Sequence, residues 1–278
     1  MSSPSSAGRD DSAPPPLKIC PAFCDANADI TFKSSDAVLF KIHSKYLAAT
    51  SGGLQVPANF LTSPDEVIPL EEPSEILILL FQFIHPRTEV NNFRQPLVMN
   101  MKPDILFPLA EAAEKYQVFG AMNTCITRFY QLIKQYPLEI LNHTYRHGYF
   151  DLANQVAIET ISKPLDEIVR RLTHPGLLQR WVLYYDHWRK VAIAGITSCN
   201  EWHNPVECSI WPTIKTNYLA AVIKNSWDHN YVLDHEKPCV HSLAFGTTTC
   251  KRTHYVKTIQ DQIALGIRNI PEFSDIVV

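Results

Sequence analysis

The chain has 278 residues, of which 46% are hydrophobic and 19% are charged. This composition can bury the core of one large domain or two modest ones, so global disorder is not expected. The formal net charge is −3 and the densest basic spot near the C-terminus is only Lys251-Arg252, which argues against a nucleic-acid partner. The longest strongly apolar run, Ile76 to Phe81, is too short to span a bilayer, so no membrane partner is expected.

The N-terminus is rich in Ser and Pro and has no apolar segment, which is unlike a secretory signal. Such a stretch buries too little to offset its ordering entropy, so residues 1–24 are predicted to form a disordered tail. The seven cysteines are an odd number. Without an export signal they indicate free thiols in the cytoplasm or the nucleus.

The pattern after the tail predicts a small sheet. Residues 28–32 and 38–42 are expected to form two strands of a hairpin. Residues 44–51 read as a short helix that stops at Gly52-Gly53. Residues 67–70 form a candidate third strand, and its proline restricts it to an edge of the sheet.

A strongly apolar helix is predicted over residues 75–85, with Ser74 as its N-terminal cap and Pro86 as its end. Because it is apolar nearly all round, it should lie at the centre of the first core. The side chains expected to form that centre are those of Leu79, Phe81 and Phe83.

Two further helices follow, the first capped by Asp104 and broken at Gly120, the second ending before Pro137. After Pro137 the apolar period stays helical. The predicted fold is therefore α+β: a mixed domain over residues 25–136, then an all-α region over residues 137–278. Helices in that region are expected near residues 152–161, 165–172, 178–192, 210–227 and 256–267.

The segment ADITFKSSDAVLFKIHSKYLAATS is similar to the opening of BTB/POZ domains. In that family an Asp opens the first strand, the second strand leads to a His, and a Leu-Ala helix ends in Ser. The segments VIPLEEPSEILILLFQFIH and FPLAEAAEKYQVFGAMNTCITRFYQ resemble the family's third strand, central helix and following helix pair. The segment YPLEILNHTYRHGYFDLANQVAIETI resembles BACK-like helices. The positions that match the opening of the family are Asp29, His43, Leu47, Ala48 and Ser51.

The resemblance implies a non-enzymatic adaptor or scaffold that binds protein partners and self-associates. One implied role is a substrate adaptor for a cullin-type ubiquitin ligase. The alternatives are a transcriptional regulator and a metal-stabilised protein associated with nucleic acid. Members that self-associate use an N-terminal amphipathic helix, but prolines at positions 14, 15, 16 and 21 block one here. Any homodimer is therefore expected to be weak or to use another surface.

Two residues of the resembling segment have alternative interpretations. Asp29 either accepts local backbone N–H groups or lines a ligand pocket. Family members with a charged pocket carry a basic residue directly after the His, whereas Ser44 follows His43 here, and this weakens the pocket interpretation. His43 is interpreted as structural, because the sequence designates no partner that would make it a general base.

The C-terminal half contains potential soft metal ligands, which either form a zinc site or are scattered thiols and imidazoles. No CxxC pair occurs among them, so no metal site is predicted. No cofactor and no catalytic residue are predicted either. Trp202, Trp211, Tyr218 and Trp227 form an aromatic group that is assigned to a core or, alternatively, to an interface. The potential ligands are Cys199, His203, Cys208, Cys239, His241, Cys250 and His254.

Overall fold

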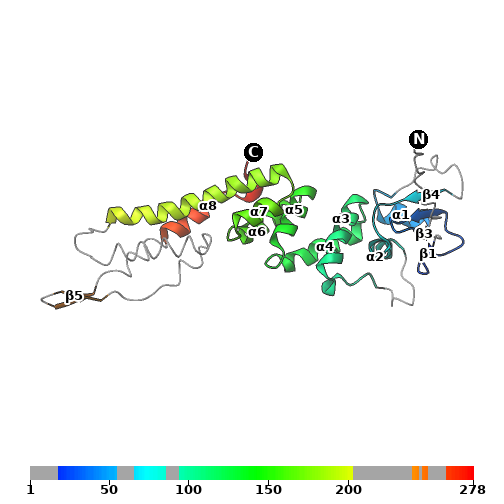
Figure 1. The fold of residues 1–278 in the computed structure, drawn as a ribbon, viewed down its shortest axis with the longest axis horizontal. Helices are drawn as coiled ribbons and strands as arrows, with labels where there is room; N and C mark the ends of the chain where they lie inside the picture. The colour runs from blue at the N-terminus through cyan, green and yellow to red at the C-terminus, as the bar shows by residue number, and fades with distance from the viewer. Residues whose placement is uncertain (1–17, 55–65, 86–93, 203–239, 244–245, 250–260) are drawn as a thin grey trace, which may run out of the picture. The chain divides into compact units, whose positions relative to one another are not determined.

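The computed structural model describes residues 18–54, 66–85, 94–202, 240–243, 246–249 and 261–278 (Figure 1). The chain divides into two compact units, Met1–Arg128 and Phe129–Val278, here called the N-terminal and the C-terminal unit. The first combines a four-stranded sheet with helices, so the predicted α+β class is confirmed. Among the residues described, no helix is both long and apolar enough to cross a membrane.

The sheet of the N-terminal unit has the strand order β1-β3-β2-β4. Strands β2 (Ile30–Lys33) and β3 (Val38–Ile42) form the expected antiparallel hairpin, with Phe32 opposite Phe40. Strand β4 (Val67–Pro69) pairs in parallel with β2 and lies at the edge, where its proline does not remove a hydrogen bond of the sheet interior. Strand β1 (Lys18–Ile19) pairs in parallel with β3.

The expectation of a disordered tail reaching residue 24 does not hold for residues 18–24. Beyond β1, the side chains of Cys20 and Phe23 are buried, and the Phe23 carbonyl accepts the N–H of Lys41 at 2.9 Å. The Phe23 ring lies 5.8 Å from the ring of Phe81. Cys20 and Phe23 are thus part of the core beside the sheet. A strand of only two residues leaves no pattern in the sequence from which this could be predicted.

The end of helix α1 (Ser44–Thr50) meets the turn after helix α3 (Pro103–Lys115). The buried Ser51 hydroxyl donates to the Tyr116 carbonyl at 2.7 Å, and the N–H of Gly53 donates to the same oxygen at 3.0 Å. A Cβ on Gly53 would lie 2.9 Å from the carbonyl carbon of Tyr116, and one on Gly52 would lie 2.2 Å from Gln117 Oε1. The close approach of two backbone segments therefore requires glycine at position 53, whereas the nearest atom to a Cβ on residue 52 would be the end of a flexible side chain.

Helix α2 (Ser74–Ile84) is central, but three local expectations are corrected. Ser74 is its first residue and Pro73 its N-cap, so Ser74 does not cap the helix. Asp104 lies in the first turn of α3, after the N-cap Lys102. The break expected at Gly120 lies earlier, at residues 116–118, because Gln117 adopts a left-handed backbone with φ 50°. Helix α4 (Phe119–Leu132) then contains Gly120.

The described part of the C-terminal unit is mostly helical, and its α5 (Pro137–His147) and α6 (Phe150–Thr160) pack together. The turn between them uses Gly148 with φ 78°, a left-handed conformation that glycine adopts without strain. Helices α7 (Leu165–Arg171) and α8 (Pro175–Trp202) follow. The buried stripe of α8 consists of Leu177, Trp181, Tyr184 and Trp188.

The prediction of an all-α C-terminal region is wrong over residues 240–249. Strands β5 (Val240–Leu243) and β6 (Gly246–Thr249) pair there as an antiparallel hairpin. The helix expected at 210–227 lies outside the described residues. Residues 261–268 are helical and overlap the helix expected at 256–267. The chain ends with the 3-10 helix η3 (Phe273–Asp275); another, η2 (Val98–Asn100), precedes α3.

The burial pattern of α2 predicts how two neighbouring leucines respond to truncation. Leu80 is fully buried, whereas Leu79 is only half-buried, so the sequence-based choice of Leu79 as a core centre was off by one position. We expect Leu80→Ala to lower the free energy of unfolding by about 2–5 kcal/mol, and Leu79→Ala to lower it by clearly less. Urea denaturation of both variants measures the difference; equal losses would contradict the assigned face.

The contact of Gly53 with the Tyr116 backbone predicts a position-specific response to alanine. Gly53→Ala should destabilise the protein by about 1–3 kcal/mol, because a backbone segment has to move. The matched control is Gly120→Ala, since Gly120 is helical and its nearest neighbour is the exposed Gln95 side chain at 3.2 Å. That control should change stability by less than about 1 kcal/mol, in the stabilising direction. Thermal melts that rank the two variants in the opposite order would refute the packing described here.

Candidate interaction surface

Asp29 and Ser44 connect the start of the hairpin to the start of α1. Asp29 Oδ1 accepts the Ser44 backbone N–H at 2.8 Å, and Oδ2 accepts the Ser44 hydroxyl. Burial raises the pKa of Asp29, but the two bonds from Ser44 lower it by more, so the net pKa is below 3.8. The carboxylate thus caps α1, the first of the two interpretations of Asp29.

Asp36 repeats this arrangement at the other end of β2. Its Oδ1 accepts the backbone N–H of Ser74 at 2.8 Å, and its Oδ2 accepts the Ser74 hydroxyl at 2.6 Å. Burial raises the pKa of Asp36, while hydrogen bonds from Ser34 and Ser74 lower it to about 2 overall. Helix α2 is therefore capped at its first residue by a side chain 38 positions earlier in the chain.

His43 has a carboxylate partner that the sequence did not designate. Its Nε2 lies 3.1 Å from Oδ2 of Asp25, whose side chain is 52% exposed. The Asn27 backbone N–H and the His43 ring lower the pKa of Asp25. The rings of Tyr46 and His85 lie 5.5 and 5.8 Å from the ring of His43. These contacts place His43 at the junction of β3, α1 and the end of α2.

The adjacent carboxylates Glu71 and Glu72 lie in two different environments. Glu71 is 88% exposed beside Lys115, whereas Glu72 is only 15% exposed. Glu72 Oε1 lies 2.9 Å from Lys115 Nζ, and Oε2 accepts the hydroxyl of Tyr116. Burial and the Glu72 carboxylate raise the pKa of Tyr116 to about 12. Glu72 thus ties the start of α2 to the end of α3.

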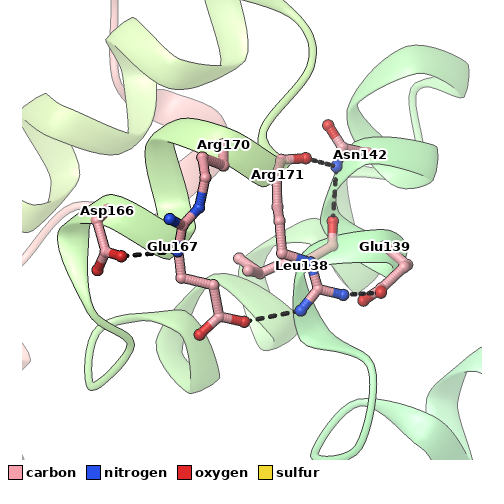
Figure 2. Close-up of polar contacts among 7 residues, drawn as sticks. All are labelled: Leu138, Glu139, Asn142, Asp166, Glu167, Arg170 and Arg171. Carbon is pink, nitrogen blue, oxygen red and sulfur yellow. Dashed lines mark hydrogen bonds and ion pairs between the residues drawn. The ribbon is translucent and has the colours of Figure 1, made fainter.

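In the C-terminal unit, a polar network holds α7 against α5 (Figure 2). The Arg171 guanidinium binds Glu139 of α5 and, at 2.7 Å, Glu167 of its own helix. Asn142 of α5 donates to the Arg171 carbonyl at 2.7 Å, and its Oδ1 accepts the Thr173 N–H at 3.0 Å. Asn142 therefore satisfies the C-terminal end of α7, and both ends of its side-chain amide are used.

This network leaves two apolar side chains of α7 exposed to solvent. Leu165 and Val169 are 53% and 60% exposed, while Ile168 and Leu172 are buried. The two exposed residues are four positions apart and share one face of the helix, next to its buried face. We call Leu165 and Val169 the α7 stripe. Exposed apolar side chains on a fixed helix can contribute to a surface that binds another protein.

The candidate zinc ligands cannot be placed as a group. Cys199 lies in α8 and His241 in β5 by their backbones, but their side chains and the other five residues of the set lie outside the described part of the chain. The same holds for the side chains of the aromatic group at 202, 211, 218 and 227. The expectation of no bound zinc therefore stays a prediction. The described cysteines Cys20, Cys24 and Cys125 are free thiols.

Capping by Asp36 predicts a pH-dependent contribution to stability. Because its pKa is about 2 in the folded chain and 3.8 ordinarily, the stabilisation is complete above about pH 4 and is lost as the pH falls towards 2. Asp36→Ala should cost about 0.5–2 kcal/mol at pH 7, in the lower part of that range because the residue is exposed. Denaturant unfolding of both proteins from pH 7 to pH 2 measures it.

The control is Asp36→Asn, which keeps an oxygen for the Ser74 N–H and should cost less. The difference in unfolding free energy between wild type and Asp36→Ala should shrink in acid. A difference that stays constant down to pH 2 would contradict the assigned role of the carboxylate.

Comparison with known proteins adds no family assignment: no protein-family model, no curated protein and no solved structure matches this chain. The functional argument therefore rests on the residues and contacts described above.

Proposed function

We propose that this protein is a non-enzymatic adaptor or scaffold that binds other proteins. The observation that carries the proposal is the α7 stripe, with Leu165 and Val169 more than half exposed on a helix that is fixed in place. Burying such side chains against a partner is favourable at roughly 25 cal/mol per Å² of apolar surface. A fixed helix also loses little conformational entropy on binding.

The contacts around α7 support a preformed surface. Arg171 bridges the two helices, Asn142 holds the C-terminal end of α7, and Ile168 is fully buried beneath it. On the helix face opposite the buried Ile168, and next to the α7 stripe, Asp166 and Arg170 form an exposed ion pair of 2.7 Å. An apolar patch bordered by charged groups has the usual anatomy of an interface centre and rim.

The N-terminal unit supports the same proposal, because its polar side chains bind one another and the starts of helices. Asp29 and Asp36 cap helices, Glu72 binds Lys115 and Tyr116, and His43 pairs with Asp25. These contacts have a structural purpose, which suits a scaffold better than a reaction centre. The element order of hairpin, short helix, third strand, central helix and helix pair is also the order that the BTB/POZ resemblance implies.

Within this proposal, bridging a protein substrate to a cullin-type ubiquitin ligase is the favoured role, and recruitment of transcriptional regulators is the alternative. Self-association is proposed to be weak. The segment that the family uses for dimerisation is occupied here, because β1 pairs with β3 and Phe23 is buried in the same chain. A stable dimer would have to use another surface or exchange that segment.

The double variant Leu165→Ser/Val169→Ser tests the proposal. Both side chains are exposed, so folding should change by only about 0.5 kcal/mol per site, while partner binding should fall at least tenfold. The matched control is Val182→Ser/Leu183→Ser, which removes two apolar side chains that are 50% and 44% exposed on α8. Affinity purification with quantitative mass spectrometry compares the three proteins and scores any cullin directly.

A partner set that is lost from the α7 variant and kept by the α8 variant is the expected result. The proposal is wrong if wild type and α7 variant recover the same proteins in the same amounts.

A further inference from the structure

The last residues of the chain return to the C-terminal unit and dock there. Phe273 of η3 is 1% exposed and Ile276 is 6% exposed, although Val277 next to it is 87% exposed. Helix η3 packs against α6 and α8. The Phe273 ring meets the ring of Tyr184 of α8 edge-on, with centroids 5.4 Å apart and an interplanar angle of 88°.

Side chains of α6 and α8 bind both backbone polar groups of Ser274. The Ser274 N–H donates to Asn154 Oδ1 at 2.8 Å, and the Ser274 carbonyl accepts Arg180 Nη1 at 3.0 Å. The amide nitrogen of Asn154 donates to Glu272 Oε2 at 2.7 Å. One side-chain amide therefore recognises an acidic side chain and the N–H two residues later.

The receiving side chains are held by the helices of the unit. Arg180 of α8 lies over the ring of Tyr145 of α5, with its guanidinium carbon 5.4 Å from the ring centroid. Tyr184 is 4% exposed, and burial raises the pKa of its hydroxyl. We call Asn154, Arg180 and Tyr184 the docking site.

The segment approaches along α8. In Figure 1 the red helix of residues 261–268 lies beside α8. Ile263 of that helix is 5% exposed, and a Cβ on Gly266 would lie 2.7 Å from Val191 Cγ1. The helix of residues 261–268 thus makes close contacts with α8, and the residues that follow it in the chain reach the docking site.

These contacts within one chain are of the kind that also hold a short peptide on a receptor. Two apolar anchors three positions apart enter buried positions, one acidic residue precedes them, and the backbone between them is held by side chains of the helices. The recognition does not use the Ser274 side chain, because both bonds go to its backbone. A partner segment with the pattern Glu-Phe-x-x-Ile presents the same groups.

We propose that the docking site on α6 and α8 binds Glu-Phe-x-x-Ile segments of partner proteins, and that residues 272–276 occupy it within the free protein. The chain's own segment then competes with the partner, so only a partner at sufficient concentration displaces it. The α7 stripe plays no part in this proposal, which adds a second surface to the proposed adaptor function. Failure of either surface in its own test leaves the other unaffected.

A fluorescently labelled peptide with the sequence of residues 269–278 tests the proposal. The receptor is the full chain carrying Phe273→Ala and Ile276→Ala, which removes both anchors of the competing segment. Fluorescence anisotropy should show saturable binding at micromolar concentration, and wild type should bind at least tenfold more weakly. A peptide with the Ser274→Ala change should bind equally well, and one with Phe273→Ala at least tenfold more weakly.

Adding Asn154→Ala to the receptor should weaken binding at least tenfold, whereas adding the exposed-site control Val182→Ala should not. If the double variant does not fold, wild type gives the same information by hydrogen exchange. Excess unlabelled peptide should then accelerate exchange of the Ser274 amide.

Three results would overturn the proposal. The first is absence of saturable binding by the folded receptor, together with unchanged exchange in wild type. The second is binding that ignores the Phe273→Ala change in the peptide. The third is a Phe273-dependent dimer of wild type in light scattering, because the site would then serve exchange between two copies of this chain.

Discussion

Two carboxylates of one hairpin fix where two helices of the N-terminal unit begin. Asp29 directly precedes β2 and holds Ser44 of α1, while Asp36 lies in the turn after β2 and holds Ser74 of α2. Each carboxylate binds the backbone N–H of a serine with one oxygen and its hydroxyl with the other. Because the two carboxylates lie at opposite ends of β2, which is paired on both sides, this one strand positions both helix starts.

The contacts of the rest of the unit follow from these two anchors. Helix α1 is fixed at its start, and just after its end the Ser51 hydroxyl and the Gly53 N–H donate to the Tyr116 carbonyl. With α2 fixed at its start, Glu72 reaches Lys115 and the hydroxyl of the same tyrosine. The turn after α3 is therefore held from both sides. In the C-terminal unit, Asn142 and Asn154 act similarly, each binding a backbone segment distant in sequence.

The sequence predicted what depends on local pattern, namely the hairpin, the edge strand at Pro69 and the presence of α2. It placed Phe81 and Phe83 of α2 in the core correctly, but it chose Leu79 instead of Leu80, since a helix that is apolar nearly all round does not reveal which of the two leucines points inwards. The capping partners were not predictable, because Asp36 and Ser74 are 38 positions apart. The docking of Ser274 on Asn154 joins residues 120 positions apart, and no local period encodes it. The exposure of the α7 stripe was not predictable either, because its two residues and the buried Ile168 and Leu172 follow the same apolar spacing along the helix.

The account of the N-terminal unit depends on its polar groups being structural, and capping by the two aspartates is the central part of that claim. The most direct measurement is an NMR pH titration that follows the amide resonances of Ser44 and Ser74. If the carboxylates of Asp29 and Asp36 accept these protons, both resonances should shift in acid with midpoints below 3.8, that of Ser74 at about 2. Midpoints at or above 3.8, or amide shifts that do not follow the acid titration, would contradict the account.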